Sequence, residues 1–255
     1  MLRKIELIEM RMGLKNKTKK INRTIDVYGN CTNDRVIMCL DLLEETWGNE
    51  KNPIYESFED PIDGLIKTVL SQNTNDRNRD KAWQSLKQKF PSWDKVMSAE
   101  VGEVAAAIRS AGIANVKAQR IKTILTKINS SLGECSLKKL RDWLKEDIKE
   151  FLGSLPGVGP KTVACVLLFD IGIPAFPVDT HVARVSKRLG FIEKKASPIE
   201  IEQFLENVVP EERFLGGHLN MIAHGRVTCK AIKPKCTACS LANLCELAKS
   251  RGDNF

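Results

Sequence analysis

The sequence predicts an all-α fold with two helical lobes. Apolar residues recur at helical spacing along almost the whole chain, and no convincing series of alternating strands is present. The chain has 255 residues, of which 42% are hydrophobic. That length and composition suffice for one large core or two smaller ones, and we expect two.

Start and stop signals divide the chain into helices. Capping residues mark the starts, for example Asp60 followed by Pro61, and the capping box of Ser197 and Glu200. Glycine or proline marks the ends. The predicted helices begin at Pro61, after Ser98, near Asn115 and after Ser197, and the last three end at Gly112, Gly133 and Pro210.

The charge of the chain favours a nucleic acid as its partner. The formal net charge is +8 and the sequence pI is about 9.0, and neutralising phosphates releases counterions and gives sequence-independent affinity. Residues 1–24 hold eight Lys or Arg against two Glu. We therefore expect a basic, flexible N-terminal extension over residues 1–28, with an electrostatic arm for DNA as the weaker alternative.

The sequence does not predict a membrane protein. Its longest apolar run, residues 163–169, has seven residues, far short of the ~20 needed to span a bilayer. No apolar signal region follows the N-terminal charges. We expect a cytoplasmic, DNA-associated protein without a membrane partner, acting as a monomer.

Four cysteines near the C-terminus have the spacing of a metal centre. They follow the order C-x6-C-x2-C-x5-C, at Cys229, Cys236, Cys239 and Cys245. Four thiolates can saturate either tetrahedral zinc or an iron–sulfur cluster. Structural zinc sites usually present two close pairs, whereas only one pair is close here, which favours the cluster. The alternative is ordinary buried or disulfide-bonded cysteines. The remaining four, Cys31, Cys39, Cys135 and Cys165, are expected to be reduced thiols.

Residues 155–162, LPGVGPKT, predict a tight hairpin between two helices. Gly157 and Gly159 allow backbone conformations closed to other residues, and Pro160 suits the first turn of the second helix. Unpaired amides at a helix N-terminus can hold a phosphate without reading any base. The alternative is a packed loop between two core helices.

Lys161 and Asp179 are the predicted catalytic pair. Lys161 lies in the first turn of the second helix, where the helix dipole and a desolvating pocket would favour its neutral amine. Asp179, in the sequence VDTH, follows a loop that can turn the chain back toward Lys161. An amine beside a carboxylate fits Schiff-base chemistry at a sugar C1′. The alternatives are a solvated surface lysine and an N-cap aspartate.

The hairpin, the VDTH sequence and the four cysteines, in this order, resemble endonuclease III of the helix-hairpin-helix DNA glycosylase superfamily. The resemblance covers roughly residues 34–248. It implies a six-helix barrel domain over residues 54–173 and a cluster domain from residues 29–53 plus 174–250, with double-stranded DNA between them. It also implies that Lys161 is the nucleophile, that Asp179 is the catalytic aspartate, and that the four terminal cysteines bind a 4Fe-4S cluster.

The resemblance also implies the residues that contact DNA. Two loops would enter the duplex, and they would place a polar filler at Asn73 and an apolar wedge at Ile113. The family usually has glutamine where this chain has Asn73, and Gln72 stands one place earlier, so either could be the filler. Ile113 could instead be a buried hydrophobe. The remaining expected DNA contacts are Ser71, Leu155, Gly157, Val158, Gly159, His181, Lys230, Lys233 and Lys235.

The sequence therefore predicts a bifunctional DNA glycosylase and abasic-site lyase of base excision repair, which removes oxidised pyrimidines and nicks the strand by β-elimination. One alternative is an adenine-mismatch or other mismatch glycosylase, although the adenine-mismatch branch generally lacks lysine at the Lys161 position. The other is a non-catalytic iron–sulfur protein that only binds DNA.

Overall fold

The computed structural model describes residues 33–48 and 58–251, and this part of the chain contains α-helices, short 3-10 turns and one π-helix, without a β-strand. The all-α prediction is confirmed. The predicted extension over residues 1–28 and Cys31 lie outside the described residues. The helices are α2 (Asn33–Trp47), α3 (Pro61–Ser71), α4 (Asp76–Lys89), α5 (Trp93–Ser98), α6 (Val101–Ala107), α7 (Ala114–Leu132), α8 (Lys145–Gly153), α9 (Pro160–Cys165), α10 (Thr180–Leu189), α11 (Pro198–Val208), α12 (Phe214–Val227) and α13 (Glu246–Ser250).

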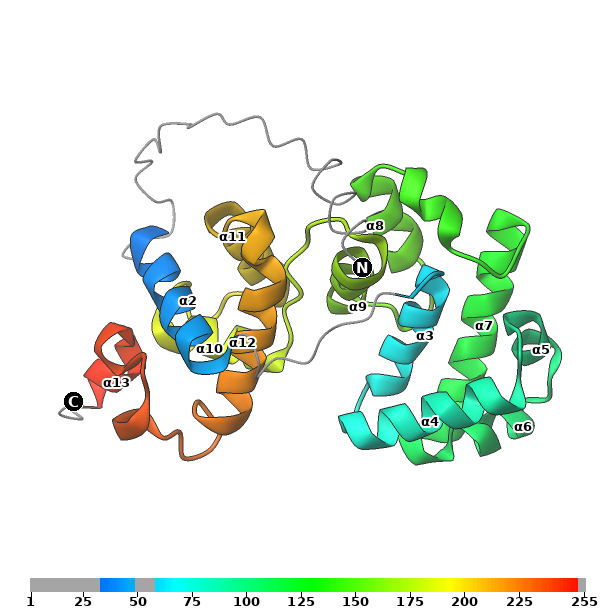
Figure 1. The fold of residues 1–255 in the computed structure, drawn as a ribbon, viewed down its shortest axis with the longest axis horizontal. Helices are drawn as coiled ribbons and strands as arrows, with labels where there is room; N and C mark the ends of the chain where they lie inside the picture. The colour runs from blue at the N-terminus through cyan, green and yellow to red at the C-terminus, as the bar shows by residue number, and fades with distance from the viewer. Residues whose placement is uncertain (1–32, 49–57, 252–255) are drawn as a thin grey trace, which may run out of the picture.

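The helices form two groups, each with its own hydrophobic core (Figure 1). The first core takes its buried residues from positions 62 to 175, on helices α3 to α9. The second core combines α2, from the N-terminal side, with residues 176 to 248. The first group is therefore one continuous stretch of the chain, and the second group is built from the segments before and after it.

The predicted helix signals at Asp60 and Ser197 are confirmed. An Asp60 carboxylate oxygen accepts a hydrogen bond from the Ile62 amide at 3.1 Å, with Pro61 in the first turn of α3. Ser197 and Glu200 form the complete capping box of α11. Each of these signals depends on residues within one helical turn, which explains why sequence reasoning found them.

Two predicted boundaries were wrong. The predicted start signal at Ser98 was wrong, because Ser98 ends α5, and the capping box of α6 is made by Glu100 and Glu103. The apolar run that follows Val163 is not a continuous α-helix either. It changes at Val166 into a π-helix, Val166–Ile171, which ends at Gly172 with φ of +84°. Local apolar spacing does not distinguish these cases, since both faces of the segment are largely buried.

Ion pairs join the two groups at their surfaces. Lys145 on α8 contacts Glu206 on α11 at 3.3 Å, and Arg226 on α12 contacts Asp76 on α4 at 3.0 Å. Surface ion pairs of this kind contribute at most about 1 kcal/mol each. Among the described residues, no helix combines the length and apolar character that crossing a bilayer requires.

Candidate active site and cysteine pocket

Lys161 stands immediately after the hairpin that joins α8 to α9. Gly159 is the N-cap of α9 and Pro160 its first residue, so Lys161 lies in the first turn. Its side chain is half-buried. The alternative of a freely solvated surface lysine therefore does not describe it.

Asp179 begins α10 at the end of the extended segment that crosses between the two cores. One carboxylate oxygen, Oδ1, accepts hydrogen bonds from the amides of His181 and Val182, both at 2.8 Å. Asp179 is thus the N-cap of α10, as the alternative predicted. Neither bond uses Oδ2, so capping leaves the second oxygen available for chemistry.

A buried histidine and a buried cysteine each feel the charges of both Lys161 and Asp179. His218 on α12 is 2% exposed, and its Nδ1 donates to the Pro177 carbonyl at 2.8 Å. Burial is the main reason that the pKa of His218 falls from 6.5 to about 4, and the Lys161 ammonium contributes in the same direction. The Asp179 carboxylate acts in the opposite direction.

The same two charges act on the buried Cys165 thiol. Burial raises the pKa of Cys165, Lys161 opposes that change, and Asp179 adds to it. Because such effects weaken with distance, Lys161 and Asp179 both lie near His218 and Cys165. The described part of the chain holds no direct ion pair between the two side chains within 4.0 Å. The structure therefore brings the predicted pair to one region without joining them.

The hairpin is held by two apolar side chains and turned by one glycine. Leu155 and Val158 are buried, and the Val158 amide donates to the Leu155 carbonyl at 3.2 Å. Gly157 has φ of +72°, which other residues rarely adopt, so its prediction is confirmed. For Gly159 the prediction was wrong. Its φ of −93° is open to any residue, and a Cβ there would meet no atom within 4 Å.

The loop between α3 and α4 places Gln72 and Asn73 in different situations. Gln72 is engaged: its Nε2 donates to the Gly157 carbonyl at 3.1 Å, and its Oε1 accepts from Arg120 at 2.7 Å. Asn73 is exposed, with φ of +55°. Ser71 donates to the Thr68 carbonyl at 2.7 Å. Of the two candidate fillers, only Asn73 has a side chain that no described contact holds.

Ile113 is not a buried hydrophobe. It is 55% exposed and follows Gly112 at the start of α7, with φ of +40°. A left-handed conformation is costly for a β-branched residue. Such strain at an exposed apolar side chain is typical of functional sites. The exposure of Ile113 rules out the alternative of a buried hydrophobe.

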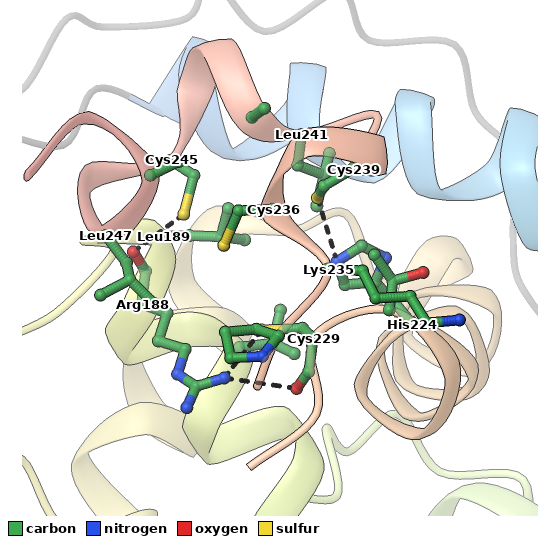
Figure 2. Close-up of a pocket in the computed structure, with 15 residues that line it drawn as sticks. Arg188, Leu189, His224, Cys229, Lys235, Cys236, Cys239, Leu241, Cys245 and Leu247 are labelled. Atoms are coloured by element: carbon green, nitrogen blue, oxygen red, sulfur yellow. Dashed lines mark hydrogen bonds between the residues drawn. The ribbon is translucent and has the colours of Figure 1, made fainter. Parts of the chain in front are cut away.

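The four terminal cysteines line one pocket between α10, α12 and the C-terminal segment. Figure 2 shows their sulfur atoms around a common space. None of the described cysteines forms a disulfide. Within residues 33–48 and 58–251, no three Cys, His, Asp or Glu side chains lie close enough to hold a single metal ion. Burial raises the pKa of Cys239 to about 11, so a thiolate there requires a cation beside it.

Arg188 and His224 contact two of these thiols, and sequence reasoning missed both. Arg188 donates to Cys229 Sγ at 3.4 Å and to the Lys230 carbonyl at 2.6 Å. His224 is 2% exposed, and its Nε2 lies 3.6 Å from Cys239 Sγ (Figure 2). They therefore support the cysteine segment from α10 and α12. Hydrogen bonds to ligand sulfurs are a common feature of cluster sites.

The segment between the first two cysteines presents positive charge to solvent. Lys230, Lys233 and Lys235 are all exposed, and the apolar Ile232 among them is 81% exposed. His181 is half-buried, with its Nδ1 at 3.0 Å from Arg184 Nη2.

Comparison with known proteins decides the family. The profile described as HhH-GPD superfamily base excision DNA repair protein matches residues 66–211, more than half of the chain. The chain belongs to this superfamily. Within it, the endonuclease III of Thermotoga maritima is 38% identical over 195 residues, which are 76% of this chain and 86% of that protein.

Two further matches of this HhH-GPD protein are also a DNA glycosylase by name and an endonuclease III. A protein of Arabidopsis thaliana whose name assigns it to the DNA glycosylases is 40% identical over 186 residues. The match covers 71% of this chain and 64% of the plant protein. The solved structure of a trapped endonuclease III–DNA covalent intermediate is 31% identical, with a TM-score of 0.75, and covers 88% of this chain and 100% of that chain. This HhH-GPD protein is an endonuclease III-like DNA glycosylase of base excision repair.

Proposed function

We propose that this HhH-GPD protein is a bifunctional DNA glycosylase and abasic-site lyase that acts on oxidised pyrimidines in double-stranded DNA. The observation that carries the proposal is the position of Lys161, half-buried after the hairpin and near the same buried His218 and Cys165 as Asp179. An amine near a carboxylate suits covalent catalysis at a sugar carbon.

Lys161 is the nucleophile in this scheme. Its neutral amine attacks C1′, the N-glycosidic bond breaks, and the base departs with the bonding electrons and takes up a proton. The lysine nitrogen then loses a proton, and its lone pair forms the C1′=N bond as the C1′–O4′ bond breaks and O4′ takes up a proton, which gives a protonated Schiff base. Removal of a C2′ proton expels the 3′ phosphate, and water releases the lysine. Asp179 stabilises the positive charge that develops on the sugar and moves protons.

Base extrusion requires residues that occupy the gap. Unstacking costs a few kcal/mol, which side chains inserted into the duplex can offset. We assign the filler to Asn73, because Gln72 is held by Arg120 and by the hairpin. The wedge is Ile113, which is exposed and lies on the adjacent loop. Ser71, the last residue of α3, and His181, in the first turn of α10, would flank the extruded nucleotide.

Phosphate contacts come from two places. The hairpin, anchored by Leu155 and Val158, presents its backbone at Gly157 and Gly159 to one strand. The lysine-bearing segment, Lys230, Lys233 and Lys235, meets the backbone from the other core.

The cysteine pocket holds a 4Fe-4S cluster in this proposal. Cys229, Cys236, Cys239 and Cys245 would ligate it, and when bound it would fix the lysine-bearing segment in place. Support comes from four soft ligands around one pocket and from the Arg188 and His224 contacts at two of them. Iron and acid-labile sulfide in protein purified without air test this assignment, and stoichiometric zinc without sulfide would overturn it.

The two cores correspond, we propose, to domains of residues 54–173 and 29–53 plus 174–250. DNA lies between them, and one chain suffices for activity. The protein would therefore work as a monomer on DNA inside the cell. Activity proportional to protein concentration, with a monomeric mass in solution, would support this.

Borohydride trapping tests the proposed function. The protein should be trapped covalently on a thymine glycol duplex, and Lys161→Gln should abolish the adduct while DNA affinity stays within about threefold. Lys139→Gln, at an exposed lysine on the 3-10 helix Lys138–Asp142, is the matched control and should trap normally. An active protein that never traps would reject the lyase half.

The competing functions predict different substrate panels. Rates on duplexes with thymine glycol, uracil, mispaired adenine and oxidised guanine should be highest for thymine glycol. Preference for mispaired adenine would support a mismatch glycosylase. Tight binding without turnover on any duplex would support a non-catalytic DNA-binding protein.

A further inference from the structure

One face of α7 carries buried or half-buried cations that contact main-chain or side-chain oxygens in the loops expected to meet DNA. Lys117 and Arg120 are three residues apart and therefore share a side of the helix. Figure 1 shows α7 alongside α3, and the two helices are in contact. Neither residue belongs to the proposed chemistry of Lys161 and Asp179.

Lys117 connects the chain just before the α3–α4 loop to the chain just before the Gly112–Ile113 turn. It is 0% exposed, and its Nζ donates to the Leu70 and Ala111 carbonyls, both at 2.8 Å. Leu70 lies three residues before Asn73, and Ala111 two residues before Ile113. Burial lowers the pKa of Lys117, with Arg120 contributing, so keeping an ammonium here is costly. The two strong hydrogen bonds offset that cost.

Arg120 joins the first of these loops to the hairpin. Its Nη1 donates to Gln72 Oε1 at 2.7 Å, and Gln72 Nε2 donates to the Gly157 carbonyl at 3.1 Å. The guanidinium also packs against Gly157 so closely that a Cβ there would overlap it. Two turns further along α7, Lys127 donates to the Ser154 carbonyl at 3.3 Å. All three DNA-facing segments are therefore linked to one helix.

The backbone in these segments needs such support. Asn73 has φ of +55° and Ile113 has φ of +40°, and both side chains are exposed. Left-handed residues of this kind cost about 1–3 kcal/mol each and persist only when their surroundings hold them. The contacts of Lys117 and Arg120 lie directly beside these strained positions.

We propose that Lys117 and Arg120 are positioning residues that hold the α3–α4 loop, the Gly112–Ile113 turn and the hairpin in one fixed arrangement, so that Asn73 and Ile113 enter the duplex in register with Lys161. The proposal rests on the proposed glycosylase function. It predicts that disturbing the α7 contacts impairs base extrusion more than chemistry on a site that has already lost its base.

The test compares two substrates for each variant. Single-turnover base release from a thymine glycol duplex requires extrusion, whereas borohydride trapping on a preformed abasic-site duplex does not require removal of a stacked base. Arg120→Met should slow base release by about 10-fold or more, since misplacement by about 1 Å can cost up to about 100-fold. Trapping at the abasic site should fall by less than about threefold. Arg120→Lys keeps a donor and should recover part of the loss.

Lys122→Met is the matched control. Lys122 lies on the same helix and also donates to a main-chain carbonyl, that of Ala99, away from the DNA-facing segments. It should leave both rates unchanged. Lys117→Met is a second variant whose thermal midpoint is measured in parallel, because loss of a buried charge can destabilise the fold. The double variant Arg120→Met with Gln72→Leu should release base little more slowly than either single variant, because both substitutions break the same chain of hydrogen bonds from Arg120 through Gln72 to Gly157.

A third readout separates this proposal from the proposed function. Fluorescence of 2-aminopurine placed opposite the lesion reports unstacking without any chemistry. Wild-type and Lys122→Met protein should raise the fluorescence, and Arg120→Met should raise it less. Equal base release by Arg120→Met and wild type, or an equal loss in base release and trapping, would overturn the positioning role. If wild-type protein never traps, the lyase proposal fails and the fluorescence comparison alone decides the role of α7.

Discussion

Asp179 has two roles in this account, and two substitutions separate them. As N-cap of α10 it accepts two hydrogen bonds through Oδ1, and as a carboxylate it supports charge on the sugar. Asp179→Asn keeps an oxygen in the capping position and removes the charge. Asp179→Ala removes both. The two variants should therefore agree in activity and differ in stability.

The magnitudes follow from the cap geometry. Loss of an N-cap costs about 0.5–2 kcal/mol, and two bonds of 2.8 Å place Asp179→Ala in the upper half of that range, about 1–2 kcal/mol. For a domain of this size that corresponds to a fall in Tm of roughly 2–8 °C. Asparagine caps about as well as aspartate, so Asp179→Asn should change stability by less than about 0.5 kcal/mol. Loss of acid–base catalysis should slow base release by about 100-fold or more in both variants.

Thermal unfolding and single-turnover base release measure the two roles. Ser197→Ala is the matched control, since it removes the cap of α11, a helix outside the proposed chemistry, and should lower Tm without slowing base release. If Asp179→Asn kept full activity, the carboxylate would have no catalytic role. If it lost as much stability as Asp179→Ala, the capping argument would be wrong.

Three further predictions test the hairpin, the buried histidine and the basic segment. Gly157→Ala should destabilise the protein by more than about 1 kcal/mol because of φ +72° and overlap with Arg120, whereas Gly159→Ala should be nearly neutral in urea unfolding. Because the pKa of His218 is lowered from 6.5 to about 4, the unfolded state binds its proton first as pH falls. The contribution of His218 to stability should therefore drop by about 1.5 kcal/mol between pH 6.5 and 5, and His218→Gln should lose less stability over this range by about that amount. Lys233→Gln should reduce the salt dependence of DNA affinity by about one phosphate contact, and an unchanged slope would contradict that contact.

Much of the fold was predictable because its signals are local. Asp60, Ser197 and Gly133 mark helix ends through contacts within one turn, and the structure has helix boundaries at each. The π-helix after Val166 was not predictable, since apolar residues there satisfy either helix type. Ile113 shows the same limit. Only the backbone, turned by Gly112, decides whether its side chain faces the core or solvent.

Parts of the site required tertiary structure. Nothing in the sequence relates Gln72 to Arg120, 48 residues away, or Arg188 to Cys229, 41 residues away. Lys117 did leave a signal, because it occupies the apolar side of α7 together with Ala118 and the isoleucines that follow. A charged residue at a core position indicates a buried polar contact, and it could have directed attention to α7.

The most direct test of the central claim identifies the nitrogen that bonds to DNA. Protein would be reduced with borohydride on an abasic-site duplex, digested, and mapped by mass spectrometry. We predict that the sugar-derived mass lies on the peptide containing Lys161 and on no other. A modified residue elsewhere in the chain, or an active protein with no modified peptide, would contradict the account.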